Sequence, residues 1–254
     1  MLKFGRVNSI FILLVPVIFI LNLPSYLYLL LVVGWLVLTS IGSFHIRWNY
    51  FLKAFHANPS IKKKSVAITF DDGPYPVITL KIVELLRQYN AKATFFCVGK
   101  QIEENPEIFM QVVQAGHTIG NHSYSHSNNF GFFSTKRVLE ELKKTDDLIF
   151  SLITKKVRLF RPPFGVTNPN IAKAIKQNQY DVIGWNVRSL DTKIQEPKKI
   201  VERVTKKLKA GDIILLHDTN ERTVLVLEQL LLFLQKNEFK TSTVEQLFEL
   251  EAFH

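Results

Sequence analysis

Two adjacent carboxylates follow a short apolar, β-branched run. The run Ser65–Phe70 is typical of a buried strand, and Asp71 and Asp72 come immediately after it, ahead of Gly73. Because neighbouring side chains of an extended chain point to opposite sides, one carboxylate can hold a metal while the other faces a substrate or water. An ordinary Asp-Gly-Pro turn has the same sequence, so the two aspartates alone do not indicate a functional site. Other candidate site residues are needed to support that interpretation.

Two histidines in the segment Asn121–His126 are the natural partners. His122 and His126 are four residues apart, which places two imidazoles on one face of a helical turn. Imidazole is a favoured ligand of zinc and related divalent metals, and with Asp72 the pair forms an Asp-His-His set with positions left open for water. We therefore expect a divalent metal cofactor, with zinc favoured and cobalt or manganese as alternatives.

Further polar residues follow other apolar runs. Arg161 comes after Val157–Phe160 and is suited to orient a buried carboxylate, and His217 ends the run that starts at Ile213 and is a candidate general acid. Trp185, in the run Val182–Asn186, offers an apolar wall, although core packing explains it equally well.

Three more residues complete this reading. Asp191 is a candidate carboxylate partner for an imidazole, whereas His117 lies at the start of a strand and is read as structural. Cys97 is the chain's single cysteine and lies in an apolar run, so it is read as a core residue and we expect no disulfide-linked partner.

Repeated strand–helix units must position these groups. Strand-like runs alternate with helical spacing of apolar residues throughout residues 65–254, with Asn105-Pro106, Ser134 and Asn168-Pro169 as helix starts. Such a repeat indicates a parallel sheet covered by helices, in which the carboxyl ends of the strands share one edge. About seven units predict an incomplete β/α barrel, with a doubly wound open sheet as the rival.

The polar clusters described above, taken in their order along the chain, resemble the sequence motifs of the polysaccharide deacetylases with the NodB homology domain, carbohydrate esterase family 4. The resemblance extends from Ser65 to the C-terminus and implies a distorted (β/α)7 barrel. It implies that Asp71 is the catalytic base and that Asp72, His122 and His126 are the metal ligands.

The resemblance also implies the remaining roles. Arg161 would position the base, and the backbone N–H of Phe164 would help to hold the oxyanion, beside Trp185. His217 would be the general acid, tuned by Asp191. Phe164 stands where the family commonly has tyrosine, and little effect is expected because the implied role belongs to the backbone.

One stretch departs from the family pattern. The family often shows Asp-Ser-Arg-Asp-Trp, whereas this chain has Arg188-Ser189-Leu190-Asp191-Thr192. Asp191 is kept, but a carboxylate has become Arg188 and the tryptophan has become Thr192. The catalytic set is therefore complete, while contacts along the substrate groove are altered.

The N-terminal segment is of a different kind. The 40 residues Val7–Ile46 contain no Lys, Arg, Asp or Glu; as helix they would extend about 60 Å, twice a hydrocarbon core of about 30 Å. Because Asn22-Leu23-Pro24-Ser25 breaks the run, we predict a transmembrane helical hairpin, roughly Ile10–Asn22 and Tyr26–Ser43. A cleaved signal peptide is disfavoured by the length and by the lack of a small-residue cleavage site.

This segment divides the chain into three parts. Residues 1–46 are predicted to contact membrane lipid, residues 47–64 to form a basic linker, and residues 65–254 to form the catalytic domain. The chain is then an integral protein of a bacterial-type cell membrane. Basic residues at both flanks of the hairpin favour a cytoplasmic domain, whereas the resemblance favours a domain outside the cell.

The high net charge does not indicate a nucleic-acid partner, because much of it lies in the N-terminal segment, and we expect none. The chain has 32 Lys/Arg and 22 Asp/Glu, a formal net charge of +10, but residues 1–64 hold seven of the basic residues and no acid. The remainder has 25 basic and 22 acidic residues and is close to balanced.

Together these features predict a metal-dependent hydrolase. It would remove N-acetyl groups from N-acetylglucosamine-type sugars of a cell-envelope or surface polysaccharide. Two alternatives stay open: a C–N hydrolase acting on a small or lipid-linked amide, and a non-catalytic glycan-binding membrane protein.

Overall fold

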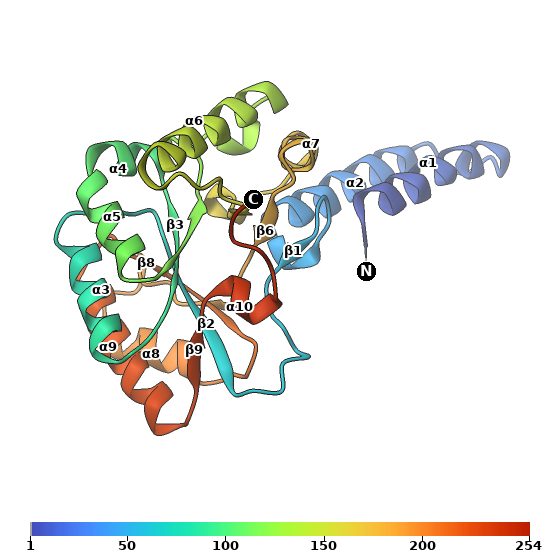
Figure 1. The fold of residues 1–254 in the computed structure, drawn as a ribbon. Coiled ribbons are helices and arrows are strands. Elements are labelled where there is room, and N and C mark those ends of the chain that lie inside the picture. The colour runs from blue at the N-terminus through green and yellow to red at the C-terminus, as the bar shows by residue number, and fades with distance from the viewer. Residues whose placement is uncertain (1) are drawn as a thin grey trace.

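A curved sheet of parallel strands, with helices on its outer side, forms the body of the protein (Figure 1). The computed structural model describes residues 2–254. The strand order is β1-β6-β5-β4-β3-β2-β8-β7, and β9 pairs in parallel with the start of β2. The bounds are β1 Ala54–Phe55, β2 Ser65–Asp71, β3 Thr94–Cys97, β4 Thr118–Asn121, β5 Leu159–Phe160, β6 Asp181–Ile183, β7 Val187–Arg188, β8 Ile213–His217 and β9 Lys240–Ser242. This half-barrel confirms the predicted α/β fold.

The helices begin where the sequence supplies caps. The side chain of Ser134 accepts from the third residue of α6, and Asn168 does the same for α7, whose first residue is proline. Asn220 caps α9 in the same way. The helix bounds in the catalytic region are α3 Ile78–Gln88, α4 Gly99–Glu104, α5 Pro106–Gln114, α6 Thr135–Ile153, α7 Pro169–Asn178, α8 Pro197–Thr205, α9 Glu221–Lys236 and α10 Val244–Phe248.

The central strand β2 is buried on both faces, and its alternation sorts residues between two layers. Val66, Ile68 and Phe70 pack in the cluster that includes α3 and α9, and Ala67 packs in the barrel interior. Successive side chains alternate, so Asp71 falls on the interior side with Ala67. The strand therefore delivers a carboxylate to the inside of the barrel at its carboxyl end.

Two antiparallel apolar helices project from one side of the barrel (Figure 1). They are α1 Phe4–Ile20 and α2 Tyr26–Phe44, and the Trp35 indole donates to the Asn8 side chain at 2.7 Å between them. By length and composition α2 is able to cross a membrane, whereas α1 is a shorter apolar helix. Two helices are present, but α1 begins at Phe4 rather than at the predicted Ile10, and insertion of both helices in a membrane stays a prediction.

The segment expected to be a linker is only partly one. β1 pairs with β6 through Ala54 and Val182, and Ile46 and Tyr50 are buried. The β1 pairing attaches part of the range 47–64 to the sheet, while Tyr50 packs against Phe4 of α1 and Gly42 of α2. At the same junction the Thr167 amide donates to the Ser43 carbonyl of α2 at 3.0 Å.

Candidate active site

The carboxyl ends of β2 and β8 place two predicted site residues side by side. Asp71 ends β2 and His217 ends β8, and the two are directly paired in the parallel register. Asp72 then leaves the strand with φ of 82°, which turns the chain sharply. The two neighbouring aspartates consequently have different surroundings, as the sequence predicts.

Asp71 is held by a fully buried arginine. Arg161 Nη1 donates to Asp71 Oδ1 at 2.6 Å and to Thr69 Oγ1 at 2.8 Å. Its other nitrogens donate to the carbonyls of Ile183 and Gly184. Burial lowers the pKa of Arg161, and the carboxylate of Asp71 opposes that shift. The pair fixes one oxygen of Asp71, and the other lies 3.8 Å from His122 Nε2.

Asp72, His122 and His126 converge on one point. Asp72 Oδ1 lies 3.5 Å from His122 Nε2 and 3.3 Å from His126 Nε2, and one donor atom from each residue lies within 4.8 Å of the others. His122 Nδ1 is 2.7 Å from the Arg161 carbonyl oxygen. Because a carbonyl only accepts, Nδ1 carries the proton and Nε2 presents its lone pair.

The protonation states suit a divalent cation. Burial and the neighbouring His122 lower the pKa of His126 to about 4, against the opposing pull of Asp72, so this imidazole is neutral near pH 7. Burial alone would raise the pKa of Asp72, but His122, His217 and His126 outweigh it and lower that pKa. Neutral imidazoles and an ionised carboxylate are the forms that bind zinc, so the residues fit the metal that the sequence predicts.

The two histidines meet through an irregular turn rather than a helical one. Ser123 and His126 have left-handed φ values of 64° and 46°, and no helix is assigned over residues 122–126. The amides of Gly99 and Lys100 donate to carbonyls of this turn, and Glu141 accepts from the Ser125 amide at 2.8 Å. His122 and His126 are close together, as predicted. Their proximity comes from this irregular turn, however, and the predicted helical turn is wrong.

His217 has a buried carboxylate behind it. His217 Nδ1 lies 2.8 Å from Asp191 Oδ1, and the His217 amide donates to Asp191 Oδ2 at the same distance. Asp191 also accepts from Ser189 and Thr223. Burial disfavours the charged imidazole, but Asp191, Asp71 and Asp72 together raise the pKa of His217 to about 9. This histidine therefore carries a proton at neutral pH.

Phe164 and Trp185 form the apolar side of the site. Phe164 has φ of 59°, is half exposed, and meets the His126 ring edge-on with 4.7 Å between centroids. The next two amides, of Gly165 and Val166, donate to carbonyls of the same turn, and the Phe164 amide has no acceptor within residues 2–254. Trp185 packs on Gly165, where a Cβ would lie 2.5 Å from the indole ring.

A pocket of about 240 Å³ collects these groups. Seven predicted site residues line it, namely Asp71, Asp72, His122, His126, Phe164, Trp185 and His217. Arg161 and Asp191 are fully buried behind the lining. His117 is buried elsewhere, its Nδ1 accepting from the Ala93 amide, and Cys97 is buried in the core.

The structure adds residues that sequence reasoning did not assign to the site. Lys193 lines the pocket, together with Arg188 and Thr192 from the departing stretch. Asp218 is buried beneath the turn after Asp72: it accepts from Thr79 at 2.6 Å, and a Cβ at Gly73 would collide with it. Its position directly after His217 was the available signal.

The matches to known proteins agree with this geometry. Residues 58–183 match the family model described as polysaccharide deacetylase. The chain is 38% identical over 190 residues to a peptidoglycan-N-acetylglucosamine deacetylase of Bacillus cereus, covering 73% of this chain and 88% of that one. It is 33% identical to the peptidoglycan-N-acetylmuramic acid deacetylase PdaC of Bacillus subtilis, covering 74% of this chain and 40% of that longer one.

A solved structure shares the fold. The Bc1960 peptidoglycan N-acetylglucosamine deacetylase, in complex with an N-hydroxybenzamide compound, superposes with a TM-score of 0.75 at 29% identity. The match covers 79% of this chain and 94% of that one.

A parallel half-barrel that brings Asp71, His217 and an Asp-His-His cluster to one strand edge is the architecture of a hydrolase of the carbohydrate esterase type. The chain belongs to the polysaccharide deacetylase family, the NodB or carbohydrate esterase family 4 enzymes, which hydrolyse N-acetyl amide bonds of glycans.

Proposed function

We propose that this protein is a metal-dependent N-deacetylase of N-acetylglucosamine-type sugars in a cell-envelope glycan. The proposal rests on the arrangement of two pairs of oppositely charged side chains, Asp71 with Arg161 and His217 with Asp191. Both pairs flank the Asp72/His122/His126 cluster in one pocket. The similarity to peptidoglycan deacetylases supports the choice of sugar.

The first half of the reaction assigns Asp71 as the base. Asp72, His122 and His126 would hold a divalent cation, which would supply Lewis-acid polarisation of the acetamide carbonyl and a lowered pKa for water. Asp71 takes a proton from the attacking water as its oxygen bonds to the carbonyl carbon. Arg161 keeps the carboxylate in place and stabilises its charge before attack.

The second half of the reaction assigns roles to Phe164 and His217. The Phe164 N–H donates to the carbonyl oxygen as negative charge develops on it. His217 then gives its proton to the sugar nitrogen as the C–N bond breaks, which releases acetate and a free amine. Asp191 holds the imidazole so that Nε2–H faces the pocket.

The experiment is acetate release by the full-length protein in detergent, because residues 46–55 pack on the catalytic body. N-acetylglucosamine oligomers, chitin-type polymer and peptidoglycan are supplied after chelation, with and without added zinc, cobalt or manganese. The proposal expects release only with metal. Metal-restored turnover refutes the non-catalytic glycan-binding alternative; metal bound without turnover on any glycan refutes the proposal.

We also propose that α1 and α2 anchor the protein in a membrane. Most of their apolar side chains are exposed, and α2 is long enough to span. Lys3, Arg6 and Arg47 lie at the two ends nearest the catalytic body, which favours a cytoplasmic domain, whereas a cell-envelope glycan requires the domain outside. Resistance to carbonate extraction of membranes, with a protease accessibility assay for the side, tests both points.

A lipid-linked sugar is the second candidate substrate, and one cavity favours it. A groove of about 500 Å³ lies between the end of α2, at Ser43 and Phe44, and the loop that carries Phe132. Phe164 lines both this groove and the catalytic pocket. A lipid chain leaving the membrane along α2 would therefore reach the site. Turnover of detergent-solubilised lipid-linked sugars but not of polymers supports this candidate, and the reverse discards it.

A further inference from the structure

Basic residues gather in one short stretch beside the active site. Residues 188–209 contain eight Lys/Arg and three Asp/Glu, whereas the whole region 65–254 contains 25 and 22. The stretch thus has a positive excess of five within a region whose total excess is three. The rest of the catalytic region is net negative, so the positive charge is concentrated rather than spread evenly over the surface.

The acids of this stretch do not neutralise the bases. Asp191 is buried and paired with His217, and Glu196 pairs with Lys199 at 2.6 Å. Glu202 lines the groove and is the one acid of the stretch that faces the basic side chains there without forming an ion pair among residues 2–254. The nearby Asp212 is occupied by the Asn186 side chain and a backbone amide. Among residues 2–254, no carboxylate lies within ion-pair distance of the remaining basic side chains Arg188, Lys193, Lys198, Arg203, Lys206, Lys207 and Lys209.

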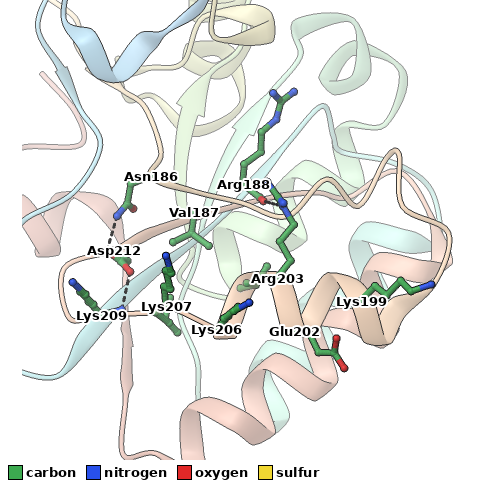
Figure 2. A pocket seen from close by; sticks show the side chains of 12 residues that line it. Asn186, Val187, Arg188, Lys199, Glu202, Arg203, Lys206, Lys207, Lys209 and Asp212 are labelled. Atoms are coloured by element: carbon green, nitrogen blue, oxygen red, sulfur yellow. Dashed lines mark hydrogen bonds between the residues drawn. The ribbon is translucent and has the colours of Figure 1, made fainter.

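The topology explains why these side chains border a groove. Only three residues separate the end of β6 at Ile183 from the start of β7 at Val187, so no helix is inserted between these two strands. A groove of about 1080 Å³ lies between β7 and the α8 region. Figure 2 shows Lys206, Lys207 and Lys209 gathered along it, with Arg203 reaching the β7 backbone.

Arg188 connects this groove to the catalytic pocket. It lines both cavities, and its side chain points away from the groove lysines in Figure 2. Lys193 lines the catalytic pocket beside it. The same position often carries an aspartate in the family pattern, so this chain has reversed the sign of the charge at the mouth of its pocket.

We propose that the site takes an anionic glycan. The N-acetylated sugar occupies the catalytic pocket, while carboxylate or phosphate groups on the adjoining sugar units bind Arg188 and Lys193. The chain continues into the groove, where Lys206, Lys207 and Lys209 meet further anionic groups. A neutral polymer gains nothing from these cations. The proposal rests on the proposed deacetylase function for the placement of the sugar.

Binding is measured separately from turnover, with the full-length Asp71→Asn protein in a neutral detergent. Three oligosaccharides of matched length serve as probes: one of N-acetylglucosamine alone, one alternating it with glucuronate, and one joined through phosphodiesters. We expect at least one acidic probe to bind about tenfold more tightly than the neutral one, with the advantage falling as salt is raised. The two acidic probes distinguish a carboxylate from a phosphate.

Charge-removing variants locate the effect. Arg188→Gln with Lys193→Gln, and separately Lys206→Gln with Lys207→Gln and Lys209→Gln, are each expected to weaken binding of the preferred acidic probe about tenfold. Binding of the neutral probe should change less than about twofold. Lys62→Gln with Lys63→Gln and Lys64→Gln is the matched control, because it removes three positive charges outside the groove.

Two results would overturn the inference: equal binding of acidic and neutral probes, or equal losses in the groove variants and the control. Acetate release by the wild-type protein from the neutral probe is assayed in parallel. Turnover without charge discrimination rejects the anionic substrate and leaves the deacetylase standing. Charge-dependent binding without turnover on any probe supports the basic site and rejects the deacetylase.

Discussion

Asp71 and His217 are paired residues at the carboxyl ends of two neighbouring parallel strands, and each has its own buried partner of opposite charge. Arg161 holds Asp71 from one side and Asp191 holds His217 from the other. Arg161 fixes the position of the Asp71 carboxyl group, and Asp191 favours the protonated form of His217. Such a pair can accept a proton on one face of a substrate and donate one on the other.

Neutralising the proposed base should stop catalysis without unfolding the protein. Asp71→Asn keeps the size of the side chain and is expected to lower kcat by at least about 100-fold, the scale of general acid–base catalysis. Metal content should stay near that of the wild type, because Asp72 and the two histidines are unchanged. Acetate release measures kcat, and elemental analysis measures the metal content. A near-normal kcat would show that Asp71 is not the catalytic base.

Removing the positioning arginine should cost stability as well as activity. Arg161 is fully buried and donates to Asp71, Thr69 and two backbone carbonyls. Arg161→Gln leaves a buried carboxylate without its partner and is expected to lower the free energy of unfolding by about 3–5 kcal/mol. Denaturant unfolding measures this, with the exposed Arg87→Gln as control. A loss no larger than that of the control would contradict the buried pair.

The proposed metal ligands can be tested directly by metal analysis. His122→Ala and His126→Ala should each lower bound zinc, because each removes one of three donors that lie within 4.8 Å of one another. His254→Ala, at the exposed C-terminus, should leave metal content unchanged. Elemental analysis after dialysis distinguishes them, and full metal occupancy in both site variants is incompatible with the assignment.

The raised pKa of His217, the proposed general acid, should make stability and activity depend on pH in the alkaline range. Burial opposes the charge on His217, but Asp191 and the active-site aspartates raise its pKa from 6.5 to about 9. Folding therefore favours the protonated form. The resulting stabilisation is complete below pH 6.5 and is lost as pH rises through about 9. Chelated protein should lose thermal stability across that window.

Asp191→Asn should reduce this pH dependence. Without the carboxylate the pKa of His217 falls, so the stability difference from the wild type should be largest below pH 6.5 and should shrink towards pH 9. In the metal-loaded enzyme the alkaline limb of kcat/KM should move to lower pH in the variant. A limb at the same pH in both proteins would mean that Asp191 does not tune His217.

Elements with strong local signals in the sequence are predicted correctly. The apolar run 213–217 is strand β8, and Ser134 begins helix α6, because burial and capping leave local signals. The short strands β1 and β7 and the helix α4 were not expected, since two to six residues hold too little periodicity.

Some features of the site, too, could not be predicted from local sequence patterns. The pairing of Asp71 with Arg161 joins residues 90 positions apart, and it came from the family resemblance rather than from any local pattern. The turn between His122 and His126 depends on the left-handed backbone at Ser123, which residue spacing does not reveal. Lys193 was missed because only the folded topology brings it to the pocket. Asp218 directly follows His217 in the sequence, but its contact with the turn at Gly73 is visible only in the fold.

The most direct test of the central claim is the product balance of the full-length protein on an N-acetylglucosamine oligomer. After chelation and addition of zinc, the account predicts equal amounts of acetate and new free amine, with both absent in the chelated protein and in Asp71→Asn. Acetate and amine formed equally well without metal, or by Asp71→Asn at the wild-type rate, would contradict it.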